Sequence, residues 1–203
     1  LLPHVDIPFH FLFESLSLEN ILVVLQSLLV EEKVLLISKS ITLLTYVAES
    51  LSSLLWPFKW PHVYVPVLPK LLCDVAESPT PFIIGLPSAY TGSIREALLT
   101  QVVCVDLDAD SVKIPEARIK EGGLPQLPQV ERESLLKDLE SICRHERTIM
   151  DKIGWHPSKP RPHVQPEAFN SLVRSAFLKF FCSILMNYRK YMLYLRAFSQ
   201  PIV

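Results

Sequence analysis

Short, almost wholly apolar runs alternate with helical patterns along the first half of this chain of 203 residues. The run "KVLLIS", which begins at Lys33, is typical of a strand buried on both faces of a parallel sheet. Further runs of this kind lie in "HVYVPVL", "SPTPFIIGL" and "QVVCVDLD". Because strand and helix alternate, the order predicts a three-layer α/β fold, in which helices flank a mostly parallel sheet.

Two predicted helices frame the first strand. Apolar residues recur at three- and four-residue spacing from Ser17, the expected N-cap, to about Val30. After the strand, Ser40 is expected to cap a second helix that ends before Pro57. The apolar stripe on the inner side of this second helix is predicted to consist of Ile41, Leu44, Val47, Leu51 and Leu54 or Leu55.

Smaller elements are predicted around the remaining strands. Pro66 interrupts "HVYVPVL", so this strand is expected to end early or to lie at an irregular sheet edge. Short helices are expected from Pro69 to Glu77 and from about Ser93 to Thr100. The segment "SVKIP" is expected to pair with the fourth strand as a hairpin.

Composition divides the chain into three parts. Residues 1–114 are the predicted sheet core, and residues 115–130 are a predicted loop or linker with three prolines and the pair Gly122-Gly123. Residues 131–203 are a predicted helical part that packs on the same lobe as a C-terminal extension. It should contain an amphipathic helix to about Lys152, the proline-rich stretch "GWHPSKPRPHVQP", and a long apolar helix or helix pair from Phe169 to about Phe198.

Charge and composition narrow the class of protein. Apolar residues make up 49% of the chain and charged residues 20%, which excludes a disordered chain. Twenty basic against 21 acidic residues argue against a nucleic-acid partner held by bulk charge. The longest apolar stretch, Phe177 to Leu195, includes charges that are costly at a bilayer centre, so we expect a cytoplasmic protein. A start at Leu1 without a signal-peptide pattern predicts a fragment of a longer protein.

The cysteines and histidines form no recognisable metal or disulfide pattern. The four cysteines are well separated and include no CxxC pair, so they are predicted to be buried free thiols. The six histidines include no HxxxH pairing. No metal ion or cofactor is expected.

Patterns for nucleotide binding and covalent catalysis are also incomplete. "KSIT" after the first strand mimics the end of a phosphate-binding loop but lacks its glycines. Asp106, Asp108 and Asp110 have the spacing of a calcium loop, but Ser111 and Ala117 stand where that loop needs glycine and glutamate. A solvated hairpin turn is the favoured interpretation. No GxSxG nucleophile motif is present, and capping accounts for Ser40.

The segment "LLWPFKWPHVYVPVLP" combines aromatic residues with proline. It could be a rigid surface that docks a partner, since tryptophan and tyrosine dominate interface hot spots. It could also be a crossover, stiffened by proline, whose aromatic rings fill the core between helix and sheet. We expect core packing for Trp56 and Phe58, while both interpretations stay open for Trp60 and His62.

Residues Leu16 to Ser88 resemble the central segment of a DENN domain. Four blocks follow the order of that family: the "EN" helix, "LLVEEKVLLISKSITLL", "LWPFKWPHVYVPVLP" and "PTPFIIG". Ala168 to Met192 resembles the downstream helical part of the domain, with less specific motifs, and Gly92 to Val164 matches it loosely.

The resemblance implies a function and a set of partners. DENN-domain proteins are guanine nucleotide exchange factors for Rab-family small GTPases, which dock across an N-terminal longin-like lobe and a C-terminal α/β lobe. This chain would be the C-terminal lobe, and the longin-like lobe is expected to be absent from it. Exchange would come from stabilising the nucleotide-free GTPase, without covalent chemistry or cofactor. Contact with vesicle or endosomal membranes would come only through the GTPase.

A candidate contact surface follows from the predicted topology. Ligands of open α/β sheets bind outside the carboxyl ends of the strands. We therefore expect Ser38, Lys39 and Ser40, together with Trp60 and His62 in a nearby loop, to help form the surface that faces the GTPase. Two alternatives stay open: a non-catalytic DENN-like scaffold that binds partners or autoinhibits, and a small-molecule hydrolase, for which no motif is present.

Overall fold

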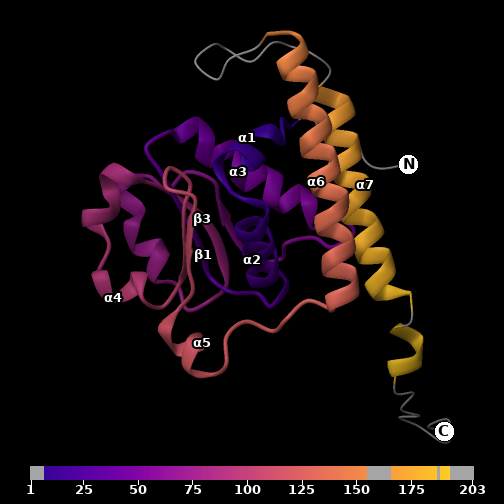
Figure 1. The fold of residues 1–203 in the computed structure, drawn as a ribbon. Helices are drawn as coiled ribbons and strands as arrows, with labels where there is room; N and C mark the ends of the chain where they lie inside the picture. The colour runs from indigo at the N-terminus through magenta and orange to yellow at the C-terminus, as the bar shows by residue number, and fades with distance from the viewer. Residues whose placement is uncertain (1–6, 155–165, 187, 193–203) are drawn as a thin grey trace, which may run out of the picture.

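The computed structural model describes residues 7–154, 166–186 and 188–192 of the chain. Figure 1 shows the arrangement of the helices and strands. In chain order the elements are α1 (His10–Ser15), α2 (Leu18–Leu29), β1 (Val34–Ser38), α3 (Ile41–Leu54), β2 (Val63–Val65), the 3₁₀ helix η1 (Lys70–Glu77), β3 (Phe82–Pro87), the 3₁₀ helix η2 (Ser88–Ser93), α4 (Glu96–Leu99), β4 (Val103–Asp106), β5 (Ser111–Lys113), α5 (Glu116–Lys120), α6 (Gln129–Lys152), α7 (Pro166–Leu185) and the 3₁₀ helix η3 (Tyr188–Tyr191).

The five strands form one sheet in the order β2-β3-β1-β4-β5. The pairs β2·β3, β3·β1 and β1·β4 are parallel, and β5 returns antiparallel to β4. This confirms the mostly parallel sheet and the hairpin formed by "SVKIP". It also confirms that the strand interrupted by Pro66 lies at an edge, since β2 ends at Val65.

Side chains alternate between the two faces of the sheet, as the pleat requires. Val34, Leu36 and Ile83 point into a core shared with α1, α2 and α3. Leu35 and Ile84 point into a smaller core on the opposite face, under η1 and α4. Both cores are buried, so the fold is a three-layer α/β structure as predicted.

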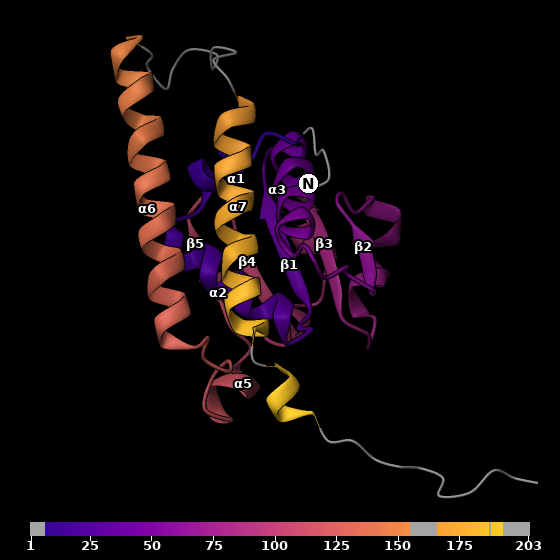
Figure 2. The ribbon, with the colours of Figure 1, turned by 90° about the vertical axis from the view of Figure 1, so that its right-hand side faces the viewer.

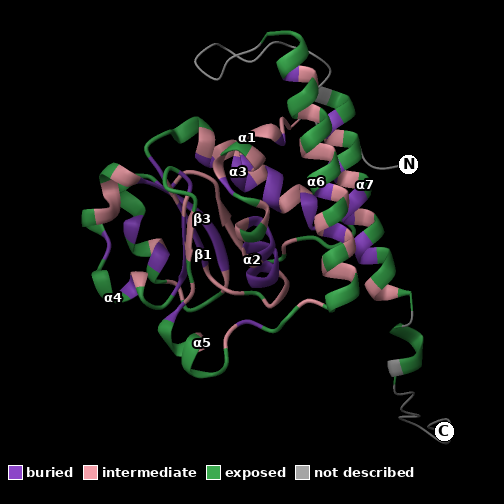
Figure 3. Ribbon diagram, in the orientation of Figure 1, coloured by how far each residue is buried: buried purple, intermediate pink, exposed green. Residues whose placement is uncertain are grey.

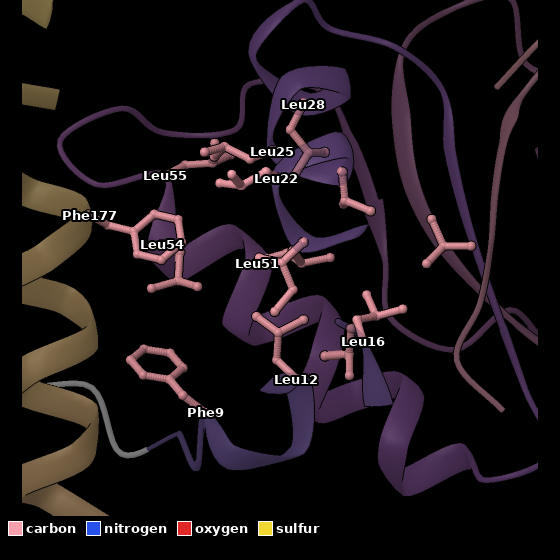
Figure 4. Close-up of a cluster of buried hydrophobic side chains, with 14 of the residues drawn as sticks. Phe9, Leu12, Leu16, Leu22, Leu25, Leu28, Leu51, Leu54, Leu55 and Phe177 are labelled. Atoms are coloured by element: carbon pink, nitrogen blue, oxygen red, sulfur yellow. The ribbon is translucent and has the colours of Figure 1, made fainter. Parts of the chain in front are cut away.

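A helical hairpin of α6 and α7 lies outside the α1–α3 layer, as Figures 1 and 2 show from two directions. Phe177 of α7 reaches toward Leu54 of α3 in Figure 4, beside the leucines of α1 and α2. Lys179 of α7 pairs with Asp138 of α6 at 2.7 Å. The hairpin is the C-terminal helical extension expected from the sequence, and it closes the core from outside. Figure 3 shows its buried inner face and exposed outer face.

Some helix boundaries differ from those predicted. The predicted loop of residues 115–130 contains the short helix α5, whose Arg118 pairs with Glu32 before β1. The helix α6 begins at Gln129 rather than Glu131, and α7 begins at Pro166 rather than Phe169. Of the long helix or helix pair expected to about Phe198, the structure describes α7 to Leu185 and then η3 (Tyr188–Tyr191). Phe198 lies outside the described residues. The helix expected around Ser93 to Thr100 is one short turn, α4, and α1 was not predicted.

Some side-chain predictions are wrong. Ser17 stands at the N-cap of α2, but its side chain makes no capping hydrogen bond. Ile41 is 56% exposed, because it lies in the first turn of α3 and points away from the stripe that begins at Leu44. Cys73 and Cys104 are buried as expected, but Cys143 is half-buried and Cys182 is exposed on α7.

Among the described residues, the segment Glu167–Lys190 is long and apolar enough to cross a membrane, by length and composition alone. Its apolar side chains Phe169, Val173, Phe177, Phe180 and Phe181 are nevertheless buried against the rest of the molecule. A core helix of a globular domain can have the same length and apolar composition. The packing of these side chains accounts for the apolar face of α7.

Candidate functional site

The carboxyl end of β1 is held by a hydrogen-bonded network. The hydroxyl of Ser38, which is fully buried, donates to Asp108 Oδ1 at 2.8 Å and accepts from the Ser40 N–H at 3.0 Å. The other carboxylate oxygen of Asp108 accepts from the Lys39 N–H at 2.9 Å. Ser40 Oγ accepts from the Leu43 N–H at 3.2 Å, which confirms the predicted N-cap. Ser38 and Ser40 therefore fix the backbone here, while the Lys39 side chain stays exposed.

The acidic turn after β4 joins three elements. Asp106 Oδ1 accepts from the Asp108 N–H at 3.0 Å, which closes the turn on itself. Asp110, at φ +46°, accepts from the Ser17 N–H and from the Asn20 side chain, both at 2.8 Å. The turn was predicted as a solvated hairpin, but its carboxylates tie β1 and α2 to the β4–β5 hairpin.

These contacts shift the pKa of Asp110. Burial raises the pKa of this carboxyl, but the hydrogen bonds from Asn20 and Ser17 together outweigh burial and hold its pKa below the ordinary value.

In residues 7–154, 166–186 and 188–192, no group of three or more His, Cys, Asp or Glu side chains could hold a metal ion.

Exposed apolar side chains accompany this network. Ile41 follows the carboxyl end of β1, and Leu71 and Leu72 lie in η1, which follows β2. Leu71 is 93% exposed and Leu72 is also exposed, because Leu72 departs from helical backbone angles and the short 3₁₀ helix turns both side chains outward. We call Lys39, Ser40, Ile41, Leu71 and Leu72 the carboxyl-edge surface. The apolar members were missed because a helical pattern assigns such residues to the core.

Trp60 and His62 lie at the opposite edge of the sheet. They precede β2, whose Val63 pairs with Phe82 at the start of β3, whereas Ser38 pairs with Pro87 at its end. The expectation that these two residues lie near Ser38, Lys39 and Ser40 is therefore wrong. Because α3 runs back along the sheet, the loop after it must emerge at the amino ends of the strands, and this rule could have placed it correctly.

Both residues take part in local contacts at this amino edge. The indole Nε1–H of Trp60 donates to the Val63 carbonyl at 3.1 Å, and its ring packs against the core. The rings of Trp60 and His62 meet edge to face at 5.1 Å. His62 Nε2 lies 3.2 Å from Glu31 Oε2, at ion-pair distance but not in hydrogen-bond geometry.

Trp56 and Phe58 depart from the core packing expected of them. They are 38% and 44% exposed, and Phe58 rests edge to face on Phe181 of α7 at 5.3 Å. Together with Lys59, Trp60 and Arg174 they line a cavity of about 290 Å³ between the end of α3 and α7. Sequence reasoning missed this cavity, because Arg174 comes from a helix more than 100 residues away in the chain.

Comparison with known proteins adds a family relationship. A model of the DENN (AEX-3) domain matches residues 1–110. The DENN domain-containing protein 2A of Homo sapiens is 35% identical over 188 residues, which cover 92% of this chain and 18% of that protein.

A protein from a plant is similar to the chain to about the same degree. The DENN domain and WD repeat-containing protein SCD1 of Arabidopsis thaliana is 33% identical over 196 residues, or 94% of this chain and 16% of that protein. The chain thus spans less than a fifth of the length of these relatives.

Proposed function

Since the chain belongs to the DENN (AEX-3) domain family, whose proteins are known as guanine nucleotide exchange factors, we propose that it is the C-terminal lobe of a factor acting on a Rab-family GTPase. In this proposal it binds the switch regions of the GTPase and promotes release of GDP. A longin-like lobe completes the GTPase-binding surface. The chain works in the cytoplasm and meets vesicle or endosomal membranes only through its GTPase.

The proposed mechanism is differential binding. An exchange factor accelerates release when it binds the nucleotide-free GTPase more tightly than the loaded one. Each tenfold preference needs about 1.4 kcal/mol of additional contact free energy. A surface held in one conformation supplies this free energy without first losing conformational entropy.

The observation that carries the proposal is the carboxyl-edge surface. The Asp108 carboxylate accepts from the Ser38 hydroxyl and from the Lys39 N–H, while the lysine side chain and Ile41 face outward. Exposed apolar side chains beside a cation, on a backbone that is already ordered, are suited to a partner surface with apolar residues and an acid. Leu71 adds apolar area after the edge strand β2, which is separated from β1 by β3.

The test measures release of a fluorescent guanine nucleotide from a panel of Rab GTPases. The chain is added alone and then with the longin-like lobe of its own protein. We expect acceleration when both lobes are present. Lys39→Glu and Leu71→Ala should each lower the rate about fivefold or more, because they alter the charge and the apolar area of the proposed contact surface. The matched control is Lys120→Glu on α5, another exposed lysine, which should leave the rate unchanged.

The outcomes separate the two functions. Suppose that the chain binds the GTPase but accelerates release neither alone nor with the longin-like lobe. This result would contradict exchange activity and support a non-catalytic DENN-like scaffold. Equal rates for Lys39→Glu, Leu71→Ala and the unmodified chain would overturn the assignment of the carboxyl-edge surface.

A further inference from the structure

The cavity beside Trp56 lies at the amino edge of the sheet, away from the carboxyl-edge surface. Its walls come from the end of α3, the loop that follows it, and α7. We call Trp56, Phe58, Lys59, Trp60 and Arg174 the aromatic groove, and the hydroxyl-bearing residues Ser52 and Ser53 complete its lining. Nothing in the proposed exchange mechanism uses this groove.

The groove is formed before any ligand binds. The Trp56 N–H donates to the Ser53 carbonyl at 3.3 Å, and the Phe58 N–H donates to the Leu55 carbonyl at 2.9 Å. The Phe58 ring rests on Phe181, and Trp60 is held by its own hydrogen bond to the Val63 carbonyl. Aromatic side chains that are already held in place lose little conformational entropy when they bind a ligand.

A narrow apolar recess continues from the groove toward the core. It is lined by Leu54, Trp56 and Phe177, with Ser53 and Arg174. Leu54 and Phe177 are almost fully buried, so an apolar group entering the groove would meet the hydrophobic core directly. The recess has a volume of only about 10 Å³, about the size of one water molecule, so it extends the apolar wall of the groove and does not itself hold a side chain.

The charge of the groove has one sign. Among the residues that the structure describes, its lining includes the cations Lys59 and Arg174 and no carboxylate. Lys59 is exposed, whereas Arg174 is half-buried, and burial lowers the pKa of its guanidinium. The exposed lysine at the rim is the cation that an approaching carboxylate meets first.

We propose that the aromatic groove is a docking site for an acidic peptide segment of a partner protein. One large apolar side chain of the segment inserts between Trp56 and Phe58. Its flanking carboxylates meet Lys59 and Arg174. The groove has a volume of about 290 Å³, at the lower limit of the size of ligand pockets. It can therefore hold one large side chain but not a long stretch of a partner. A concave site with an apolar base also fits an inserted side chain better than the flat surface of a bilayer.

The test uses an array of fluorescein-labelled peptides and the full chain, measured by fluorescence anisotropy. The central residue is phenylalanine, leucine or alanine, and the flanks are all glutamate, all serine or all lysine. Saturable binding is expected for glutamate flanks around phenylalanine or leucine. Lys59→Glu and Trp56→Ala should each weaken this binding about tenfold, because one reverses a charge contact and the other removes an apolar wall.

Controls make the result decisive. Lys120→Glu reverses the charge of an exposed lysine that does not line the groove and should leave peptide binding unchanged. Thermal unfolding of each variant shows whether the fold is retained, and Lys59→Glu keeps the test valid if Trp56→Ala unfolds. The assay contains no GTPase, so its outcome is independent of the exchange proposal.

Two results would overturn the proposal. One is equal binding of peptides with glutamate and lysine flanks, or binding that Lys59→Glu leaves intact. The other is binding to phosphatidylcholine vesicles that contain phosphatidylserine, lost in Lys59→Glu, with no peptide bound. The second result would assign the groove to a membrane surface instead.

Discussion

Gly85, in the middle of the buried strand β3, shows how one residue can fix the path of a neighbouring segment. A Cβ atom at this position would lie 1.9 Å from the carbonyl oxygen of Pro66, which is a backbone atom and cannot rotate away. The close approach lets the Leu68 N–H donate to the Gly85 carbonyl at 2.7 Å. Gly85 therefore determines how the chain leaves the edge strand β2.

Gly85→Ala is expected to lower the free energy of unfolding by about 3 kcal/mol, because the added methyl group forces two backbone segments apart. Urea unfolding at equilibrium measures the loss. Gly92→Ala is the matched control, since a Cβ atom there meets nothing within 4 Å and its backbone needs no positive φ. Equal stability of the two variants would contradict the steric argument.

The Asp110 carboxylate should make stability depend on acid pH. Its pKa is lower in the folded chain than its ordinary value of 3.8, so the ionised form stabilises the fold above that value. The contribution is lost as the pH falls through the lowered pKa. Asparagine tolerates the positive φ of this position but has no charge to lose.

Asp110→Asn should therefore cost more stability at neutral pH than at pH about 3, because that pH lies below the ordinary pKa of 3.8 and part of the stabilisation by the ionised form is lost there. Urea midpoints of both proteins at the two pH values measure the difference. Asp74→Asn, at an exposed position in η1, controls for the change in net charge. A cost for Asp110→Asn that does not change with pH would refute the role of the carboxylate.

At this scale the sequence predicted the N-cap Ser40 but not the carboxylate that holds the nearby Ser38. Ser40 lies directly before an apolar helical pattern, so its capping role could be recognised locally. Asp108 holds Ser38 from a turn 70 residues later, and only the folded sheet brings the two together. The same limit applies to Asp110 and Asn20, which are 90 residues apart.

The elements that could be predicted well are those whose apolar pattern is complete. The runs around β1, β3 and β4 are buried and were recognised as strands of a parallel sheet. The short helices α1 and α5 have too few turns to show a helical period, so their stability comes from packing and from pairs such as Arg118 with Glu32. Short helices were therefore missed from the sequence, whereas strands with a complete apolar run were predicted.

The α6–α7 hairpin stabilises the sheet-side core through one face of α7. Phe177→Ala, at a buried position, should lower the free energy of unfolding by about 3 to 5 kcal/mol. Leu172→Ala on the same helix should cost far less, because Leu172 is exposed. Urea unfolding compares them, and similar losses would show that α7 is not held by its buried face.

For the whole molecule, the main difference from expectation concerns the two ends of the sheet. The five residues first grouped as one candidate surface divide between the carboxyl edge and the amino edge. Parallel topology determines this division, since strand and returning helix end on opposite sides. The sheet was predicted correctly, but the groove needed the position of α7, which no local pattern encodes.

Two separate edges should behave as two independent sites. Lys39→Glu is expected to slow nucleotide release and leave binding of the acidic peptide unchanged. Lys59→Glu should do the reverse. The double variant should show each defect at the size of the single variant, because distant sites contribute additively. Nucleotide-release and anisotropy assays on the same preparations measure both, and a defect larger than its single value would reveal coupling between the edges.

The two outer strands have a consequence for the behaviour of the protein at high concentration. Both β2 and β5 are only three residues long, and Pro66 follows directly after the first. A neighbouring molecule therefore finds few free backbone groups with which to continue the sheet, and Pro66 has no N–H to offer. Growth of the sheet from one molecule into the next is blocked at both margins, so a crowded solution of folded chains is protected against β-type aggregation.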